Sequence, residues 1–267
     1  MLLAAALAVG ALVGFIAGLT GIGGGVLMVP FLYVLYDRLG IAPAVATPVA
    51  HATSLAVIVP VAVRALIKYQ GSGAVQWRAA LPMALAGALA AAVVAPLVTH
   101  VPANALRLGF GVFLVVIALD LLMLRGATVE HVPEARRRHL VGAALIGLPV
   151  GALSATLGIG GGVPASAGMH YLLKLPFRVI AATSLAVVLF AAVAGSVSYL
   201  FTPSELAGSR WVVGHVDLEH GLPLAVGAVL AAPLGVSVNR RAPVATLRRV
   251  FGGLLLLTGV LLIIQNT

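Results

Sequence analysis

The sequence predicts an all-α polytopic membrane protein of two inverted repeats, each with a Gly-rich helical hairpin (one helix short) and three further transmembrane helices. The composition, a series of apolar segments and an internal duplication lead to this prediction. Of the 267 residues 61% are hydrophobic and only 9% are charged, and the mean hydropathy is +1.15. Because soluble domains carry about a quarter charged residues, a soluble globular protein is excluded.

Ten apolar segments, broken by Gly, Pro or charged residues, follow one another along the chain. They cover residues 2–19, 26–36, 44–66, 78–98, 104–124, 140–157, 163–173, 179–200, 218–238 and 244–264. The second and seventh segments have only 11 residues each. As helices these two would be about 17 Å long, roughly half of a bilayer core of about 30 Å.

The chain contains an internal duplication. The hexapeptide Gly-Ile-Gly-Gly-Gly-Val at 21–26 recurs unchanged at 158–163, and Thr-Ser-Leu-Ala-Val at 53–57 recurs at 183–187. Ordered blocks of identity of this kind indicate two homologous halves. We therefore expect an N-terminal repeat over 1–124, a linker over 125–138 and a C-terminal repeat over 139–267.

The positions of the basic residues predict how the halves are oriented. If each glycine run closes a hairpin, 13 of the 16 Lys and Arg residues lie on one side of the membrane and only Arg38, Arg107 and Arg210 lie on the other. If each glycine run merely kinks one crossing helix, the same residues divide 8 against 8. The positive-inside rule favours hairpins, inverted halves, a cytoplasmic linker and both termini outside. The net charge of +9 is then explained by topology, and no nucleic-acid partner is expected.

The glycine hairpins predict an anion site. The short helices that begin near Gly24 and Gly161 expose backbone N–H groups at a positive dipole end, where anions bind. Hydroxyl groups near the turns and in the repeated Thr-Ser pairs would complete the site. The candidate substrate-binding residues are Thr20, Gly23, Gly24, Gly25, Thr53, Ser54, Ser154, Thr156, Gly160, Gly161, Gly162, Thr183 and Ser184.

Other roles for these residues remain open. Glycines in membrane helices can serve packing alone, which is our interpretation of Gly10, Gly14 and Gly18 at a spacing of four. The Thr and Ser hydroxyls can instead bond within their own helices. His51, two residues before a Thr-Ser pair, is a candidate for proton coupling.

Enzyme signatures are missing from the sequence. There is no cysteine, no H-E-x-x-H motif and no Walker A motif, and Val26 and Val163 stand where a G-x-G-x-x-G fingerprint needs its last glycine. An enzyme is therefore not expected, and neither a cofactor nor a metal is expected.

These motifs resemble the sulfite exporter TauE/SafE family. The resemblance rests on Gly-Leu-Thr-Gly-Ile-Gly-Gly-Gly at 18–25 with its copy at 156–162, and on the Ala-Thr-Ser blocks at 52–54 and 182–184. It implies a bacterial inner-membrane permease that moves sulfite, sulfoacetate or similar anions, usually outward. The second copy departs from the first, with Leu157 in place of Thr20 and Pro164 in place of Leu27.

Two functions are compatible with the sequence. The first is a secondary transporter of a small anion that alternates access between the two inverted halves. The second is a passive channel for small anions or solutes on the same hairpins. Besides the anion and the lipid bilayer, the expected partners include a second copy of the chain in a homo-oligomer.

Overall fold

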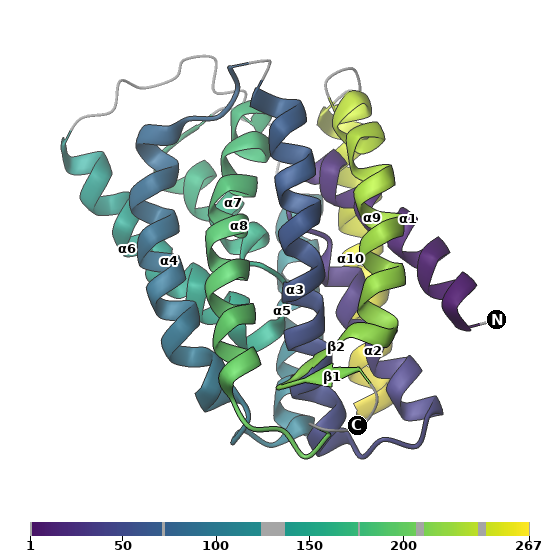
Figure 1. Ribbon diagram of the computed structural model, residues 1–267. Helices are drawn as coiled ribbons and strands as arrows, with labels where there is room; N and C mark the ends of the chain where they lie inside the picture. The colour runs from purple at the N-terminus through teal and green to yellow at the C-terminus, as the bar shows by residue number, and fades with distance from the viewer. Residues whose placement is uncertain are drawn as a thin grey trace.

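The computed structural model describes residues 2–70, 73–123, 137–175, 177–206, 211–239 and 244–266, which form a bundle of ten helices and one small sheet (Figure 1). The helices are α1 (Leu2–Thr20), α2 (Gly25–Arg38), α3 (Pro43–Gln70), α4 (Trp77–Val98), α5 (Ala103–Met123), α6 (Arg137–Leu157), α7 (Gly162–Tyr171), α8 (Phe177–Phe201), α9 (Leu218–Asn239) and α10 (Val244–Asn266). All ten predicted segments are helical, and their ends agree with the prediction to within four residues. Most of the predicted linker lies outside the described residues.

Length separates the helices into two classes. Eight of the helices in the described part of the chain are long and apolar enough to cross a membrane. The other two, α2 and α7, have 14 and 10 residues and each follows a glycine turn. The chain is therefore a multi-pass membrane protein with two short helices at the predicted positions.

A short antiparallel hairpin between α8 and α9 was not predicted. Its strands are β1 (Val212–Val213) and β2 (Val216–Asp217), with Val213 opposite Val216. Strands of two residues are too short to leave an alternating pattern of apolar and polar residues.

The first helix of each half packs against a helix of the other half. Gly10 and Gly14 of α1 face α9 so closely that an added Cβ would lie 2.9 Å from the carbonyl carbon of Leu224 and 2.5 Å from that of Ala228. This contact confirms the packing role predicted for these glycines. The second half repeats it, because Gly147 and Gly151 of α6 lie in the same way against Met83 and Gly87 of α4.

The chain reverses its direction at the first glycine turn. Contacts of Gly10 with Leu224 and of Gly18 with Ala232 show that α1 and α9 run in parallel. The far end of α2, however, lies at the beginning of α9, because the Tyr36 hydroxyl donates a 3.0 Å hydrogen bond to Asp217. Helices α1 and α2 therefore form a hairpin.

Two pairs of helices at corresponding positions of the sequence repeat pack against each other. In α5 and α10, Gly111 lies against Gly259 while Leu122 lies against Gly252. In α3 and α8, Gly195 lies against Leu55, whereas the backbone amide of Gln76, beyond the end of α3, donates to Thr183 near the beginning of α8. Each of these pairs is antiparallel.

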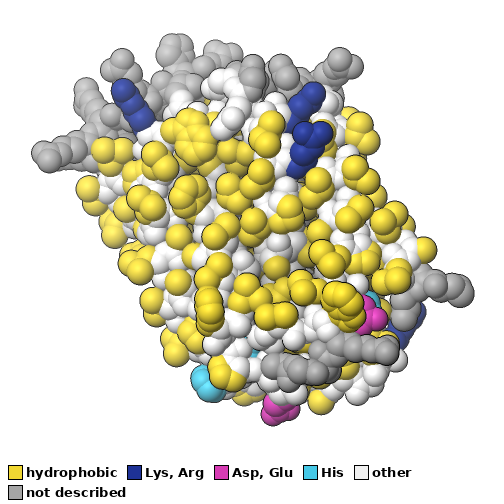
Figure 2. Space-filling view, in the orientation of Figure 1, with side chains coloured by type: hydrophobic (Ala, Val, Ile, Leu, Met, Phe, Trp, Pro, Cys, Tyr) yellow, Lys and Arg dark blue, Asp and Glu magenta, His cyan; other side chains and the backbone are white. Residues whose placement is uncertain are grey.

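The surface has the character expected for a protein surrounded by lipid. Apolar side chains cover the middle of the face in Figure 2, and Lys and Arg side chains gather near one end of it. On α4 and α9 the exposed residues are mainly leucine and valine, including Leu85, Leu89, Leu230 and Leu234. Such a belt is suited to acyl chains.

Candidate functional site

Two glycine turns lie between the paired helices, at 21–24 and at 158–161. The residue before each short helix has a left-handed backbone, with φ of 79° at Gly24 and 78° at Gly161. Residues with a side chain rarely adopt this conformation. No side chain caps either helix start. The consecutive glycines are therefore explained by the shape of the turns.

The two turns contact each other backbone to backbone. A Cβ added to Gly25 would lie 2.6 Å from the carbonyl oxygen of Gly158, and one added to Gly162 would lie 2.5 Å from the carbonyl carbon of Ile22. Residues 21–26 and 157–163 are all buried. The predicted glycine cluster thus forms one closed contact between the halves.

Ile58 and Val188 close the contact from the side of the long helices. These side chains occupy corresponding positions of α3 and α8, and both lie against Gly23 and Gly160. A Cβ on either glycine would crowd the Val188 side chain well inside ordinary van der Waals contact, at 2.9 Å for Gly23 and 3.0 Å for Gly160. The repeat thus brings equivalent residues together at its centre.

Each turn is bonded by a serine of the opposite half. Ser54 donates a 2.7 Å hydrogen bond to the carbonyl of Gly158, and Ser184 donates a 2.8 Å bond to the carbonyl of Gly21. Both serines are fully buried. The structure therefore brings these two candidate residues to the glycine turns.

The four candidate threonines use their hydroxyls differently. Thr20 and Thr156 bond the carbonyl four residues earlier in their own helices. Thr183 does the same and also accepts a hydrogen bond from the backbone N–H of Gln76. Thr53 accepts a 2.9 Å hydrogen bond from the backbone N–H of Asp217. In this conformation these hydroxyls hold backbone groups of the protein.

In the described part of the chain four buried side-chain polar atoms have no hydrogen-bond partner, and two of them lie against the glycines of the second turn. These two are the hydroxyl of Ser154 and Nδ1 of His51, and both residues are fully buried. A Cβ on Gly161 would lie 3.3 Å from Cβ of Ser154, and one on Gly158 would lie 2.7 Å from Cα of His51. Unsatisfied buried groups are rare in folded proteins and call for a functional explanation.

An ion pair joins the C-terminal end of α2 to the N-terminal end of α5, and the sequence did not predict it. Arg107 donates from Nη1 and Nη2 to the two carboxylate oxygens of Asp37, at 3.0 Å each, and from Nε to the hydroxyl of Thr47 at 3.0 Å. Its guanidinium also lies 4.5 Å from the ring centre of Tyr33. The Tyr33 hydroxyl forms a hydrogen bond with Nε2 of His51.

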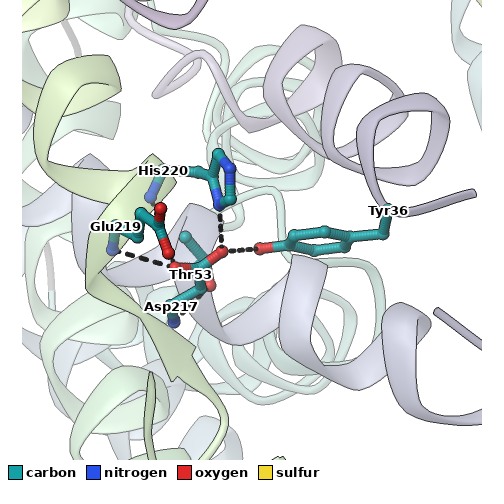
Figure 3. Close-up of polar contacts among 5 residues, drawn as sticks. All are labelled: Tyr36, Thr53, Asp217, Glu219 and His220. Atoms are coloured by element: carbon teal, nitrogen blue, oxygen red, sulfur yellow. Dashed lines mark hydrogen bonds and ion pairs between the residues drawn. The ribbon is translucent and has the colours of Figure 1, made fainter. Parts of the chain in front are cut away.

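A second polar cluster joins α2 to the beginning of α9 (Figure 3). Asp217 accepts hydrogen bonds from the Tyr36 hydroxyl and from His220 Nδ1, the latter at 2.7 Å, and its own amide donates to Thr53. Burial alone would raise the pKa of Asp217, but the hydrogen bonds from His220 and Tyr36 outweigh burial and lower it. Asp217 is therefore a charged acceptor that fixes α2 against α9.

The sequence offered one signal for these clusters. Arg107 stands one turn inside an apolar segment, where a charge is costly unless it is paired. In the distribution of basic residues it is one of the three on the sparsely charged side. Its partners come from α2 and α3, and no spacing rule connects those positions.

Comparisons with known proteins find, over nearly the whole chain, the family that the glycine and Thr-Ser motifs resemble. The model of the family described as "Sulfite exporter TauE/SafE" matches residues 6–262. A probable membrane transporter protein of Methanocaldococcus jannaschii is 26% identical over 99% of this chain and 96% of its own length. The probable membrane transporter protein YunE of Bacillus subtilis is 27% identical over 96% of each chain. A probable membrane transporter protein of Xylella fastidiosa is 30% identical over 91% of this chain and 88% of its own. No solved structure matches.

Proposed function

Because the chain belongs to the sulfite exporter TauE/SafE family and is a membrane transporter rather than an enzyme, we propose that it is a secondary transporter that exports a small anion. Sulfite, or a small organosulfonate such as sulfoacetate, is the proposed substrate. The proposed location is a bacterial inner membrane, with both termini outside.

The contact between the two glycine turns carries this proposal. Each turn starts a short helix, whose first N–H groups and positive dipole end favour an anion. The unpartnered hydroxyl of Ser154 is a further donor beside the second turn. Separation of the turns would expose these groups and the two serines Ser54 and Ser184 to a substrate.

We infer that the halves are inverted relative to each other in the membrane. Antiparallel packing of α3 with α8 and of α5 with α10 supports this inference. So does the reciprocal contact of α1 with α9 and of α6 with α4. Rocking of inverted halves around a central site is the usual way in which such repeats alternate access.

The closed centre favours a carrier over the alternative, a passive channel. Buried backbone contacts fill the point where the turns meet, and Ile58 and Val188 lie directly against it. A continuous pore along this line would require that contact to open on both sides at once. A carrier needs to open it on only one side at a time.

Transport by purified protein in liposomes tests the proposal. Sulfite and sulfoacetate flux should saturate with concentration, and unlabelled substrate on the far side should accelerate it. Saturable flux with this trans-stimulation would identify a carrier, whereas non-saturating flux that ignores the far side would identify a channel. Absence of flux for every small anion tested, with the protein correctly inserted, would contradict anion transport altogether.

A further inference from the structure

Arg107 is the one buried Lys or Arg among the side chains whose burial the structure describes, with 5% of its surface exposed. Its position is fixed from three sides by Thr47, Tyr33 and Asp37. A buried cation in a membrane protein is costly and commonly marks the path of an ion or substrate.

The partner of Arg107 is exposed, although Arg107 itself is not. The side chain of Asp37 is 45% exposed, compared with 7% for that of Arg107. Asp37 therefore reaches the guanidinium from the surface, while Thr47 and Tyr33 hold the guanidinium from within. The carboxylate could leave without disturbing those buried contacts.

A line of contacts leads inward from this ion pair. Arg107 stacks on Tyr33, Tyr33 bonds Nε2 of His51, and His51 lies against Gly158 of the second glycine turn. At the inner end of this line, the buried Nδ1 of His51 has no hydrogen-bond partner among the described residues. The line thus joins an exposed carboxylate to the contact between the two turns.

The C-terminal half repeats the arginine but not its partners, because Arg248 stands opposite Arg107 at an offset of 141. The 137-residue offset of the glycine turns places His170 opposite Tyr33 and Lys174 opposite Asp37. The 130-residue offset of the Thr-Ser blocks places Ala181 opposite His51. The partners of the arginine, and with them the line of contacts, are therefore specific to the N-terminal half.

We propose that Arg107 binds the transported oxyanion on the exterior side, and that Asp37 takes the place of the oxyanion after its release. This inference rests on the proposed transport of an anion. Sulfite and sulfonates present two oxygens that the guanidinium can bind as a pair, as it binds the carboxylate of Asp37. A halide presents a single atom and cannot make both bonds.

The exchange lowers the affinity of the exterior-facing site for the substrate. Arg107 is never left buried without an anion, because Asp37 binds as the substrate departs. Asp37 thereby competes against recapture of the substrate from outside. Because the guanidinium binds two oxygens as a pair, the expected ligand is a small oxyanion with at least two oxygens on one face.

Binding to the purified full-length protein in detergent tests the exchange, with sulfite, methanesulfonate and chloride as the probes. Asp37→Asn removes the competing charge and should tighten binding of sulfite and methanesulfonate about tenfold without a similar gain for chloride. Arg107→Lys keeps the charge but loses the paired donors, and should weaken oxyanion binding about tenfold. Arg38 is exposed and follows Asp37 directly in the sequence, so the Arg38→Lys variant should bind these oxyanions as the wild type does.

A second measurement uses the wild type alone and does not depend on whether the variants fold. Methanesulfonate should accelerate hydrogen exchange in the last turn of α2, because Asp37 loses Arg107 when the anion binds. Unchanged exchange there, despite binding, would overturn the exchange model. So would a folded Asp37→Asn variant that binds oxyanions no better than the wild type. If the wild type binds neither sulfite nor methanesulfonate, the proposed substrate class fails as well.

Discussion

Tyr69 and Tyr199 occupy corresponding positions of α3 and α8, and each holds the hairpin of its own half. Tyr69 donates a 3.1 Å hydrogen bond to the carbonyl of Gly18, and Tyr199 donates a 3.0 Å bond to that of Ala155. The serines Ser54 and Ser184 instead bond the turn of the opposite half. Loss of the two serine bonds would therefore weaken the contact between the turns, while each hairpin stays bonded to the long helix of its own half.

The serine bonds should contribute measurably to stability. Ser54→Ala or Ser184→Ala leaves a buried carbonyl without its donor, and each should lower the free energy of unfolding by about 1–3 kcal/mol. Denaturant unfolding in detergent measures this. Ser237→Ala is the control, because Ser237 is half-buried and bonds only within α9. Equal stabilities for all three variants would contradict a structural role of the cross-half bonds.

The contact between the turns should not tolerate a methyl group. Gly25→Ala or Gly162→Ala places a Cβ within 2.6 Å of the opposite turn, so the turns must move apart and transport should be lost. Gly109→Ala on α5 is the matched control, since no atom lies within 4 Å of its added Cβ. Initial transport rates at equal protein levels compare the variants. Full activity of either turn variant would remove the backbone contact from the mechanism.

The inversion of the halves can be tested by labelling. Because the chain has no cysteine, single cysteines can be introduced without further changes. Gly73→Cys follows α3 and Ser204→Cys follows α8, the corresponding helix of the second half. A membrane-impermeant maleimide applied to intact cells should label Ser204→Cys, whereas Gly73→Cys should require permeabilised cells. Labelling of both sites from the same side would contradict inverted halves.

The β-hairpin should loosen in acid. Burial lowers the pKa of His215, although hydrogen bonds to the carbonyls of Thr202 and Tyr199 act in the opposite direction. The folded state therefore favours neutral His215, and its contribution to stability is present above the unfolded pKa of about 6.5. As pH falls from 6.5 through the lower folded pKa, this contribution is lost.

Hydrogen exchange of the Val213 and Val216 amides between pH 8 and pH 5, corrected for the intrinsic dependence on pH, measures the loosening of the hairpin. His215→Gln cannot gain the charge and should remove this acid-dependent step. Persistence of the step in the variant would assign it to another group.

The sequence predicted the helices well and the polar contacts poorly. Long apolar runs and glycine breaks depend on local residues, so each helix from α1 to α10 could be located. Ser54 and Ser184 could also be chosen as candidate residues, because both belong to the duplicated Thr-Ser block. The contacts of Arg107 with Asp37 and Tyr33 depend on how α2, α3 and α5 pack together. The local sequence pattern of a single segment does not predict such contacts.

The packing of α1 on α9 has a consequence for biosynthesis. Helix α1 is made first, yet the groove that accepts Gly10 and Gly14 belongs to a helix that begins at Leu218. During almost the whole of translation, α1 must remain in the membrane with its glycine face covered only by lipid or by an assembly factor. A chain released before α9 has been inserted would therefore leave α1 without its main partner, and it is a natural target for membrane proteases.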